Sequence, residues 1–113
     1  MKQPRMTPIF VYVTCASMEE ADRIGRALVE ARLAACVNIL PGMSSLYWWQ
    51  GTIEEGRETV LITKTREALL DALTARVKAL HSYACPCVVA FPVHAGNSDY
   101  IAWIEAETAG AQP

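Results

Sequence analysis

The sequence predicts a single α+β domain with the ferredoxin-like element order βαββαβ and a short helix at its end. Stretches rich in β-branched and aromatic residues alternate with stretches whose apolar residues recur at helical spacing, and a long hairpin joins the two β-α-β halves. We expect an antiparallel sheet in the order 4-1-3-2 with both helices on one face. The 113 residues leave room for one domain, expected over 9–108 between a disordered tail at 1–8 and a loose tail at 109–113.

The first β-α unit has clear signals. The stretch Ile9–Cys15 is β-branched, aromatic and apolar, which predicts a strand. Ser17 lies three residues before Glu20, the spacing of a capping box, and apolar residues then recur at helical spacing. We therefore expect a helix over about Met18–Ala34.

A long hairpin is expected to follow. Its first strand covers Cys36–Leu40, is interrupted by a bulge at Pro41-Gly42, and resumes over Ser45–Trp49. The chain then turns near Gly51. The returning strand is expected over Glu58–Thr65.

The second half repeats the pattern. Thr65 is expected to cap a helix in which Leu69, Leu73, Val77 and Leu80 form one apolar stripe. A last strand is expected over Cys87–His94, and Pro92 within it favours a sheet edge, because proline is tolerated there. Gly96-Asn97-Ser98 then leads into the short closing helix.

Both faces of the predicted sheet are apolar. In the first strand Ile9, Val11 and Val13 alternate with Phe10 and Tyr12. With helices on one face only, the other face should be polar if it met water. We therefore expect a second copy of the chain to cover it, in a homo-oligomer.

The composition excludes several function classes. Lys and Arg number 10 against 12 Asp and Glu, for a net charge of −2 without any basic run, so we expect no nucleic-acid partner. The longest apolar runs are too short to cross a bilayer, so no membrane association is expected. No apolar secretory segment is found, so the 4 cysteines are expected to be reduced thiols in the cytoplasm.

The strand directions predict a group of donors at one end of the sheet. Cys15 ends the first strand there, His81 follows the second helix, and Cys85 and Cys87 precede the last strand. Thiolate and imidazole together suit copper or zinc rather than calcium or magnesium. For Cys15 the alternative is a small buried hydrophobe, and for at least one of Cys85 and Cys87 it is plain packing. For His81 the alternative is an exposed or helix-terminal histidine whose charge favours the helix C-terminus.

Several motifs resemble the CutA divalent-cation-tolerance family, in order and over almost the whole chain. They are Leu33-Ala34-Ala35-Cys36-Val37-Asn38-Ile39 with Pro41-Gly42, Ser45-Leu46-Tyr47-Trp48-Trp49-Gln50-Gly51, Glu58 and Leu61 ahead of Lys64-Thr65, then His81, Tyr83 and Pro86, and finally Tyr100-Ile101-x-Trp103-Ile104. The resemblance implies a tight homotrimer similar to PII signalling proteins. It also implies tolerance of divalent metals, copper above all, and no firm enzymatic reaction.

The same resemblance assigns site residues. The family's proposed copper ligands match Cys15 and His81, whereas the family's carboxylates after this histidine are replaced here by Cys85 and Cys87. This exchange favours soft metals.

A second set of residues is expected in a cleft between subunits: Glu58, Lys64, Tyr83 and Trp49. Glu58 and Lys64 share one side of their strand by parity, and Lys64 would attract an anion. The alternative is that the charged pair forms salt bridges between subunits and that Trp49 belongs to the interface core.

Two functions follow from these residues. The first is a non-catalytic homotrimer that responds to metal ions through Cys15 and His81. The second is a PII-like signalling module that binds a small anion or nucleotide in its clefts and acts on an unknown protein partner. An enzyme is not expected, because no acid-base pair or activated nucleophile can be placed.

Overall fold

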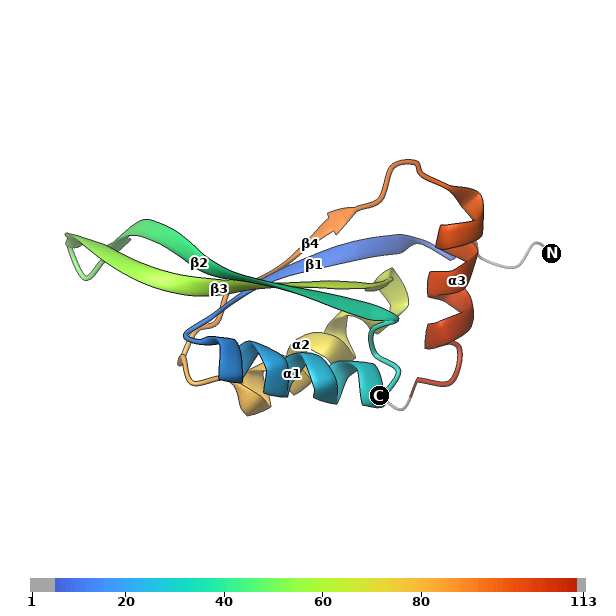
Figure 1. The fold of residues 1–113 in the computed structure, drawn as a ribbon, viewed down its shortest axis with the longest axis horizontal. Helices are drawn as coiled ribbons and strands as arrows, with labels where there is room; N and C mark the ends of the chain where they lie inside the picture. Colours follow the sequence, from blue (N-terminus) through green and yellow to red (C-terminus); the bar gives the residue numbers. More distant parts are fainter. Residues whose placement is uncertain (1–5, 112–113) are drawn as a thin grey trace.

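The computed structural model describes residues 6–111 and has the predicted α+β architecture (Figure 1). Its four-stranded sheet has the order β2-β3-β1-β4, which is the expected order read from the other edge. Strands β1 (Pro8–Cys15), β2 (Cys36–Trp49), β3 (Thr52–Arg66) and β4 (Val88–Pro92) pair antiparallel throughout. β1 begins at Pro8, one residue before the expected start of the domain, and residues 1–5 and 112–113 of the two expected tails lie outside the described part.

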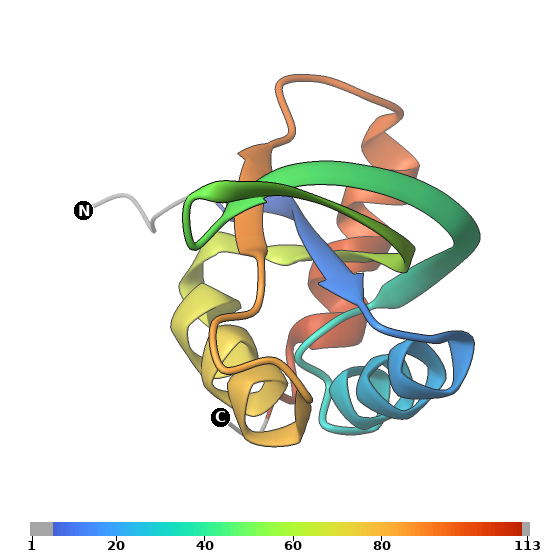
Figure 2. The ribbon, with the colours of Figure 1, turned by 90° about the vertical axis from the view of Figure 1, so that its left-hand side faces the viewer.

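Two helices, α1 (Met18–Glu30) and α2 (Leu70–Leu80), cover the same face of the sheet, as Figure 2 shows end-on. Between helices and sheet lies the core, built from alternate residues of β1 and from the apolar stripes of the helices. Its largest fully buried side chains include Ile24, Leu28, Leu61, Leu73 and Val77. This confirms the helical stripe predicted in the second half, where Leu69 is also buried and Leu80 partly so.

Helix α1 ends four residues earlier than Ala34, the predicted end. Arg32 adopts φ 61°, and the N–H groups of Arg32 and Leu33 donate to the carbonyls of Val29 and Leu28. This is a Schellman motif, whose left-handed residue is usually glycine. The apolar spacing continues past the turn, so the sequence alone did not mark the end.

The hairpin has the predicted bulge, a register shift between Leu40 and Met43. Its turn at Gln50 and Gly51 has φ values of 49° and 84°, a tight two-residue connection. β3 therefore begins at Thr52 rather than at Glu58, because the tight turn lets pairing start at once.

The segment before α2 also differs from the prediction. Thr65 lies inside β3 with its side chain buried, and its hydroxyl has no hydrogen-bond partner among the described residues, so it caps no helix. A single 3-10 turn, η1 (Glu67–Leu69), leads into α2 instead. The Glu67 N–H donates to the carbonyl of Thr7, which ties this turn to the strand beside it.

The last strand is shorter than predicted, and its edge position is confirmed. β4 pairs only with β1 and ends at Pro92. The closing helix α3 (Ser98–Thr108) is capped by Asn97, whose side chain accepts from the Asp99 N–H. It crosses the end of the sheet where β1 begins (Figure 1), and Arg66 of β3 donates to Thr108 there.

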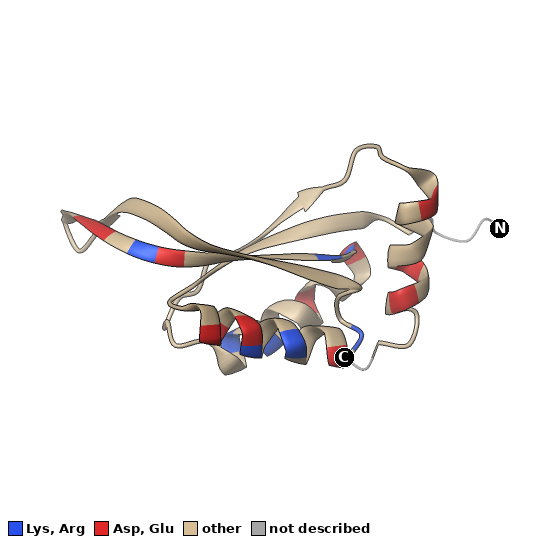
Figure 3. Cartoon of the chain, viewed as in Figure 1, with Lys and Arg blue, Asp and Glu red and all other residues tan. Residues whose placement is uncertain are grey.

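The face of the sheet opposite α1 and α2 carries large exposed apolar side chains. By register Phe10 faces Phe91 and Tyr12 faces Val89 on this side, and Phe91 is 55% exposed. β1 and β4 carry no charged residue, whereas charges line α1 and the outer part of the hairpin (Figure 3). We call this surface the open face. Within residues 6–111, no helix has both the length and the apolar character to cross a membrane.

Candidate metal centre

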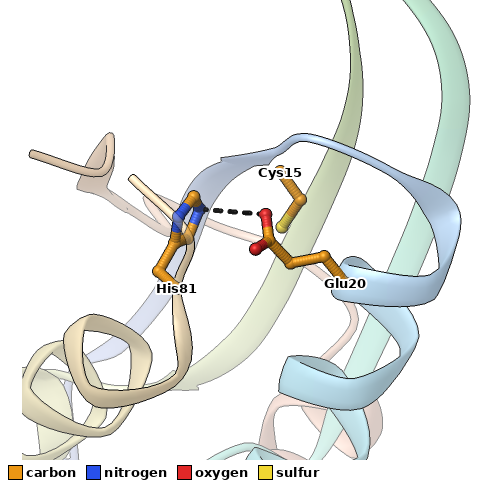
Figure 4. A group of neighbouring side chains, drawn as sticks. All are labelled: Cys15, Glu20 and His81. Atoms are coloured by element: carbon orange, nitrogen blue, oxygen red, sulfur yellow. Dashed lines mark ion pairs between the residues drawn. The ribbon is translucent and has the colours of Figure 1, made fainter. Parts of the chain in front are cut away.

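Three donor side chains converge at the end of β1. Cys15 closes the strand, Glu20 lies in the first turn of α1, and His81 directly follows α2 (Figure 4). One ligand atom from each lies within 4.8 Å of the other two. The predicted grouping of Cys15 and His81 is confirmed, and Glu20 joins them.

Glu20 reaches this place through the start of α1. The Ser17 side chain accepts from the Glu20 N–H at 3.1 Å, which confirms the cap. The Glu20 carboxylate turns back to accept from the N–H of Ala16 at 2.9 Å. The capping-box spacing of Ser17 and Glu20 is therefore the sequence signal that places Glu20 beside Cys15.

The Glu20 carboxylate links three segments. One oxygen accepts from Ala16, and the other accepts from the N–H of Ser82 at 2.9 Å. Burial alone would raise the pKa of Glu20, but the hydrogen bonds from Ala16 and Ser82, together with nearby His81, hold that pKa below its ordinary value. Glu20 is therefore a buried carboxylate that stays ionised.

His81 has both ring nitrogens engaged. Its Nε2 lies 2.7 Å from the carbonyl of Thr14, and its Nδ1 accepts from the N–H of Tyr83 at 3.0 Å. Because a carbonyl only accepts and a backbone N–H only donates, Nε2 must carry the hydrogen. The imidazole side chain is fully buried, and its Nε2 lies 3.8 Å from Glu20.

Cys15 is the soft donor of the group. Its residue is fully buried, and burial, followed by the charges of Glu20 and Glu58, raises the pKa of its thiol to about 12. The thiol is therefore protonated at neutral pH. A metal that binds here has to displace this proton.

The donor set fits a soft or borderline metal, since it combines a thiol, an imidazole and a carboxylate. Glu20 can still ligate, because each carboxylate oxygen has a second lone pair after accepting one hydrogen bond. His81 would have to give up a hydrogen bond with Thr14 or Tyr83. The three side chains are thus chemically suitable as metal ligands, but both ring nitrogens of His81 are engaged in hydrogen bonds within the chain.

Cys85 and Cys87 do not belong to this group among the described residues. They line a neighbouring cavity on the open face, since the segment between α2 and β4 passes to that side, where Tyr83 meets Glu58. Burial, and then the charge of Glu58, raises the pKa of Cys87. Their role as additional ligands stays a prediction.

The four residues predicted for a cleft separate into two places. Glu58, Tyr83 and Trp49 line the same cavity, together with Tyr47, which the sequence reasoning missed. Lys64 lies elsewhere on the open face, where its Nζ is 3.1 Å from the hydroxyl of Tyr100.

The ammonium group of Lys64 lies between two aromatic rings, which attract a cation. Its Nζ is 5.3 Å from the ring centroids of both Phe10 and Tyr100. β3 presents Glu58 and Lys64 on one face, as parity predicted, but six residues apart, roughly 20 Å along the strand.

Known proteins are similar to this chain in sequence and in fold. The sequence profile described as CutA1 divalent ion tolerance protein matches residues 9–107. The divalent-cation tolerance protein CutA of Thermus thermophilus is 48% identical over 98 residues, which cover 87% of this chain and 95% of that protein. Protein CutA 1, chloroplastic, of Oryza sativa subsp. japonica is 48% identical over 100 residues, 88% of this chain but 56% of the rice protein.

A solved structure agrees at the level of the fold. The periplasmic divalent cation tolerance protein CutA from Archaeoglobus fulgidus superposes with a TM-score of 0.87 at 42% identity, covering 89% of this chain and 98% of that one. The chain thus spans little more than half of the rice protein and nearly all of the two prokaryotic ones. By sequence profile, identity and fold together, the chain belongs to the CutA1 divalent ion tolerance protein family.

Proposed function

We propose that this chain responds to divalent metal ions by binding a soft metal, copper above all, as a non-catalytic homotrimer. The observation that carries the proposal is the convergence of Cys15, Glu20 and His81 within 4.8 Å at the end of β1. Family membership supports the role in divalent-cation tolerance. The identity of the metal and the trimer are our inferences.

Binding would use what each side chain already offers. Cys15 would release its proton and bind as thiolate, and Glu20 would contribute an oxygen while keeping its bonds to Ala16 and Ser82. His81 would turn one ring nitrogen from its backbone partner toward the metal. Because a proton leaves Cys15, affinity should rise with pH.

The test is calorimetric titration of Cu(I) and Zn(II) into the reduced protein without oxygen. We expect Cys15→Ser and His81→Ala each to weaken binding by about tenfold or more, since each removes one ligand. Cys36→Ser is the matched control, because Cys36 opens β2 at the opposite end of the sheet. Equal affinities of Cys15→Ser and the wild type would contradict the proposed site.

A trimer is supported by the open face. Phe91, Val89 and Leu40 are each about half exposed there, and no charged residue lies on β1 or β4. An apolar sheet face of this kind is stabilised when another copy covers it. The same surface is where neighbouring subunits would meet.

An alternative function rests on Lys64. Within residues 6–111, no carboxylate lies within 4.0 Å of its Nζ, so this cation is available to an anion. A PII-like effector site would then bind inorganic phosphate or ATP there. Lys64→Ala should abolish such binding and the exposed Lys78→Ala should not, whereas unchanged binding in Lys64→Ala would exclude this site.

We also propose that the protein works in a reducing compartment such as the cytoplasm. All 4 cysteines are free thiols, and Cys15 needs its thiol to bind metal. The names of relatives differ on this point, since one is called chloroplastic and another periplasmic. Fractionation of the native cells, with an antibody against the protein, would show which compartment holds it. Recovery in the cytoplasmic fraction would support the proposal.

A further inference from the structure

His81 is held by backbone groups at both of its ring nitrogens. Its Nε2 lies 2.7 Å from the carbonyl of Thr14 on β1, and its Nδ1 accepts from the N–H of Tyr83 at 3.0 Å. The imidazole is fully buried and the Glu20 side chain is 6% exposed within this one chain, so these contacts do not depend on a neighbouring copy. The hydrogen of the neutral ring is therefore fixed on Nε2, and the free lone pair is on Nδ1.

Nε2 is the ring nitrogen directed at the other candidate ligands. It lies 3.8 Å from the Glu20 carboxylate, and Figure 4 shows it on the edge of the ring that faces Glu20 and Cys15. Nδ1 is directed instead at the main chain of the segment that follows His81. A metal held by all three side chains would therefore be bound through Nε2.

Ligation through Nε2 requires the hydrogen of the ring to change place. A ring nitrogen binds a metal through its lone pair, and the neutral imidazole keeps one hydrogen. Nε2 gives up its proton and Nδ1 takes up a proton, so the ring stays neutral and the Thr14 carbonyl loses its donor. Nδ1–H and the Tyr83 N–H are then two donors that face each other, where a donor and an acceptor met before. The main chain at Tyr83 therefore has to move away.

The segment after His81 is attached through these same side chains. Residues 81–87 form no helix or strand. Ser82 donates its N–H to Glu20 at 2.9 Å, and Tyr83 donates its N–H to His81. Glu20 can keep the bond from Ser82 while it ligates, because each oxygen has a second lone pair, whereas His81 cannot keep the bond from Tyr83. The segment would thus stay anchored at Ser82 and be released beyond it.

We propose, on the basis of the metal binding proposed above, that His81 ligates through Nε2 and that this ligation releases the main chain at Tyr83. Residues 83–87 would then change position with metal occupancy. They run from the candidate metal centre to the open face, where we propose that copies of the chain meet. A protein without catalysis could pass a metal signal to its own assembly or to a partner in this way.

Nuclear magnetic resonance tests the position of the ring hydrogen, because the two nitrogens of a histidine differ in chemical shift according to which one carries it. The sample is the full chain, labelled with nitrogen-15, in its native assembly and under reducing conditions. Without metal we expect the hydrogen on Nε2 of His81, and with one equivalent of Zn(II) per chain on Nδ1. His94 is the internal control and should keep its signals, since it is exposed and follows β4 at the far end of the sheet.

Hydrogen exchange of single amides in the same samples measures the release. The Tyr83 amide should exchange about tenfold faster with Zn(II) than without it, because its hydrogen bond is lost. The Ser82 amide is the matched control, since its bond to Glu20 is kept. Unchanged exchange at Tyr83 in the zinc-loaded protein would overturn the coupling.

Two variants at position 83 test the same hydrogen bond by affinity. Tyr83→Pro has no N–H at this position, whereas Tyr83→Ala keeps the N–H and also lacks the phenol. In zinc calorimetry we expect Tyr83→Pro to bind about fivefold more tightly than Tyr83→Ala, because it has no such bond to give up. Equal affinities of the two variants, both shown to fold by circular dichroism, would contradict the coupling. If the proline variant does not fold, the exchange rates of the wild type decide.

Failure of the coupling and failure of the metal site give different results. Zinc binding that is lost in Cys15→Ser but leaves the hydrogen on Nε2 of His81 would overturn the coupling and keep the site. A hydrogen on Nδ1 before zinc is added would also overturn it, since no rearrangement would then be required. No zinc binding, or equal affinities of Cys15→Ser and the wild type, would contradict the proposed function and the coupling together.

Discussion

Glu20 shows how one side chain can organise a site. It is buried to 4% exposure, yet its two oxygens accept from backbone N–H groups of Ala16 and Ser82, on segments far apart in the sequence. A buried carboxylate is tolerated only where such donors compensate its lost hydration. The same bonds hold His81 next to Cys15, so the arrangement of the candidate ligands depends on Glu20.

Replacing this carboxylate tests its structural role. Glu20→Gln keeps the shape but turns one acceptor into an NH₂ group facing a backbone N–H, so one buried donor loses its partner. We expect a loss of about 1–3 kcal/mol in the free energy of unfolding, measured by urea titration at neutral pH. Glu19→Gln, in the same turn but exposed, is the control. Similar stability of the two variants would contradict this role.

The lowered pKa of Glu20 also predicts a pH dependence. A carboxyl group whose pKa is lower in the folded chain contributes stability that is present above its unfolded pKa and is lost as the pH falls through the folded value. The loss should therefore begin below about pH 4.5, the ordinary value of this group. The wild type should lose stability more steeply than Glu20→Gln in this range, in urea titrations at successive pH values. Parallel profiles would rule out the effect.

Thiol accessibility distinguishes Cys15 from Cys85. Cys15 has no exposed surface and a pKa of about 12, whereas Cys85 is exposed. Iodoacetamide at neutral pH should therefore modify Cys85 in the folded protein and Cys15 only after unfolding in urea, because the thiolate is the reactive form. Mass spectrometry of the peptides measures both rates. Equal labelling in the folded state would show that Cys15 is not enclosed.

At the scale of elements, the hairpin turn determines how far β2 and β3 extend. Gln50 and Gly51 both have positive φ values, which a two-residue turn requires in order to match the twist of the strands. Glycine adopts this conformation without strain, whereas a residue with a Cβ is less suited to it. Gln50 is thus the strained position of this turn.

Two substitutions at this position should act in opposite directions. Gln50→Asn should raise the free energy of unfolding by about 0.5 kcal/mol, because asparagine tolerates positive φ. Gln50→Val should lower it by about 1–2 kcal/mol, because a β-branched side chain clashes in this conformation. Gln50 is exposed, so packing changes little. The midpoint of thermal unfolding, measured for both variants and the wild type, tests these changes. Equal midpoints would show that the turn is not strained.

For the whole molecule, the open face is the surface on which we propose that copies of the chain assemble. The fold places α1 and α2 on one side of the sheet (Figure 2), so Phe91, Val89 and Leu40 on the other side stay about half exposed in the described residues 6–111. Phe91 lies on the edge strand β4 of this surface, with its ring 6.4 Å from that of Tyr12 on β1. A charge there would meet the apolar surface of any copy packed on it.

Phe91→Glu should therefore dissociate the proposed trimer, at a cost of about 2 kcal/mol or more in association free energy. Light scattering after gel filtration measures the mass. Met18→Glu is the control, since Met18 is also exposed and apolar but starts α1, away from the open face. A monomeric wild type, or a trimeric Phe91→Glu variant, would contradict the predicted interface.

The sequence by itself determined the order of elements and the topology, because apolar periodicity and turn residues are local signals. It also determined that Cys15 and His81 meet, since strand directions alone place the end of β1 beside the end of α2. The edge position of Pro92 followed from the chemistry of proline in the same way.

The tertiary structure decided what depends on contacts between distant segments. Glu20 joined the candidate centre because backbone N–H groups from two separate segments compensate its burial. α1 stopped at Glu30 because Arg32 adopts a left-handed conformation in a Schellman motif; its side chain then reaches Glu107 of α3, a contact that local spacing does not encode. The separation of Cys85 from Cys15 likewise depends on the path of a loop. The end of α1, the position of Glu20 and the position of Cys85 are determined by packing and burial, which depend on the whole chain.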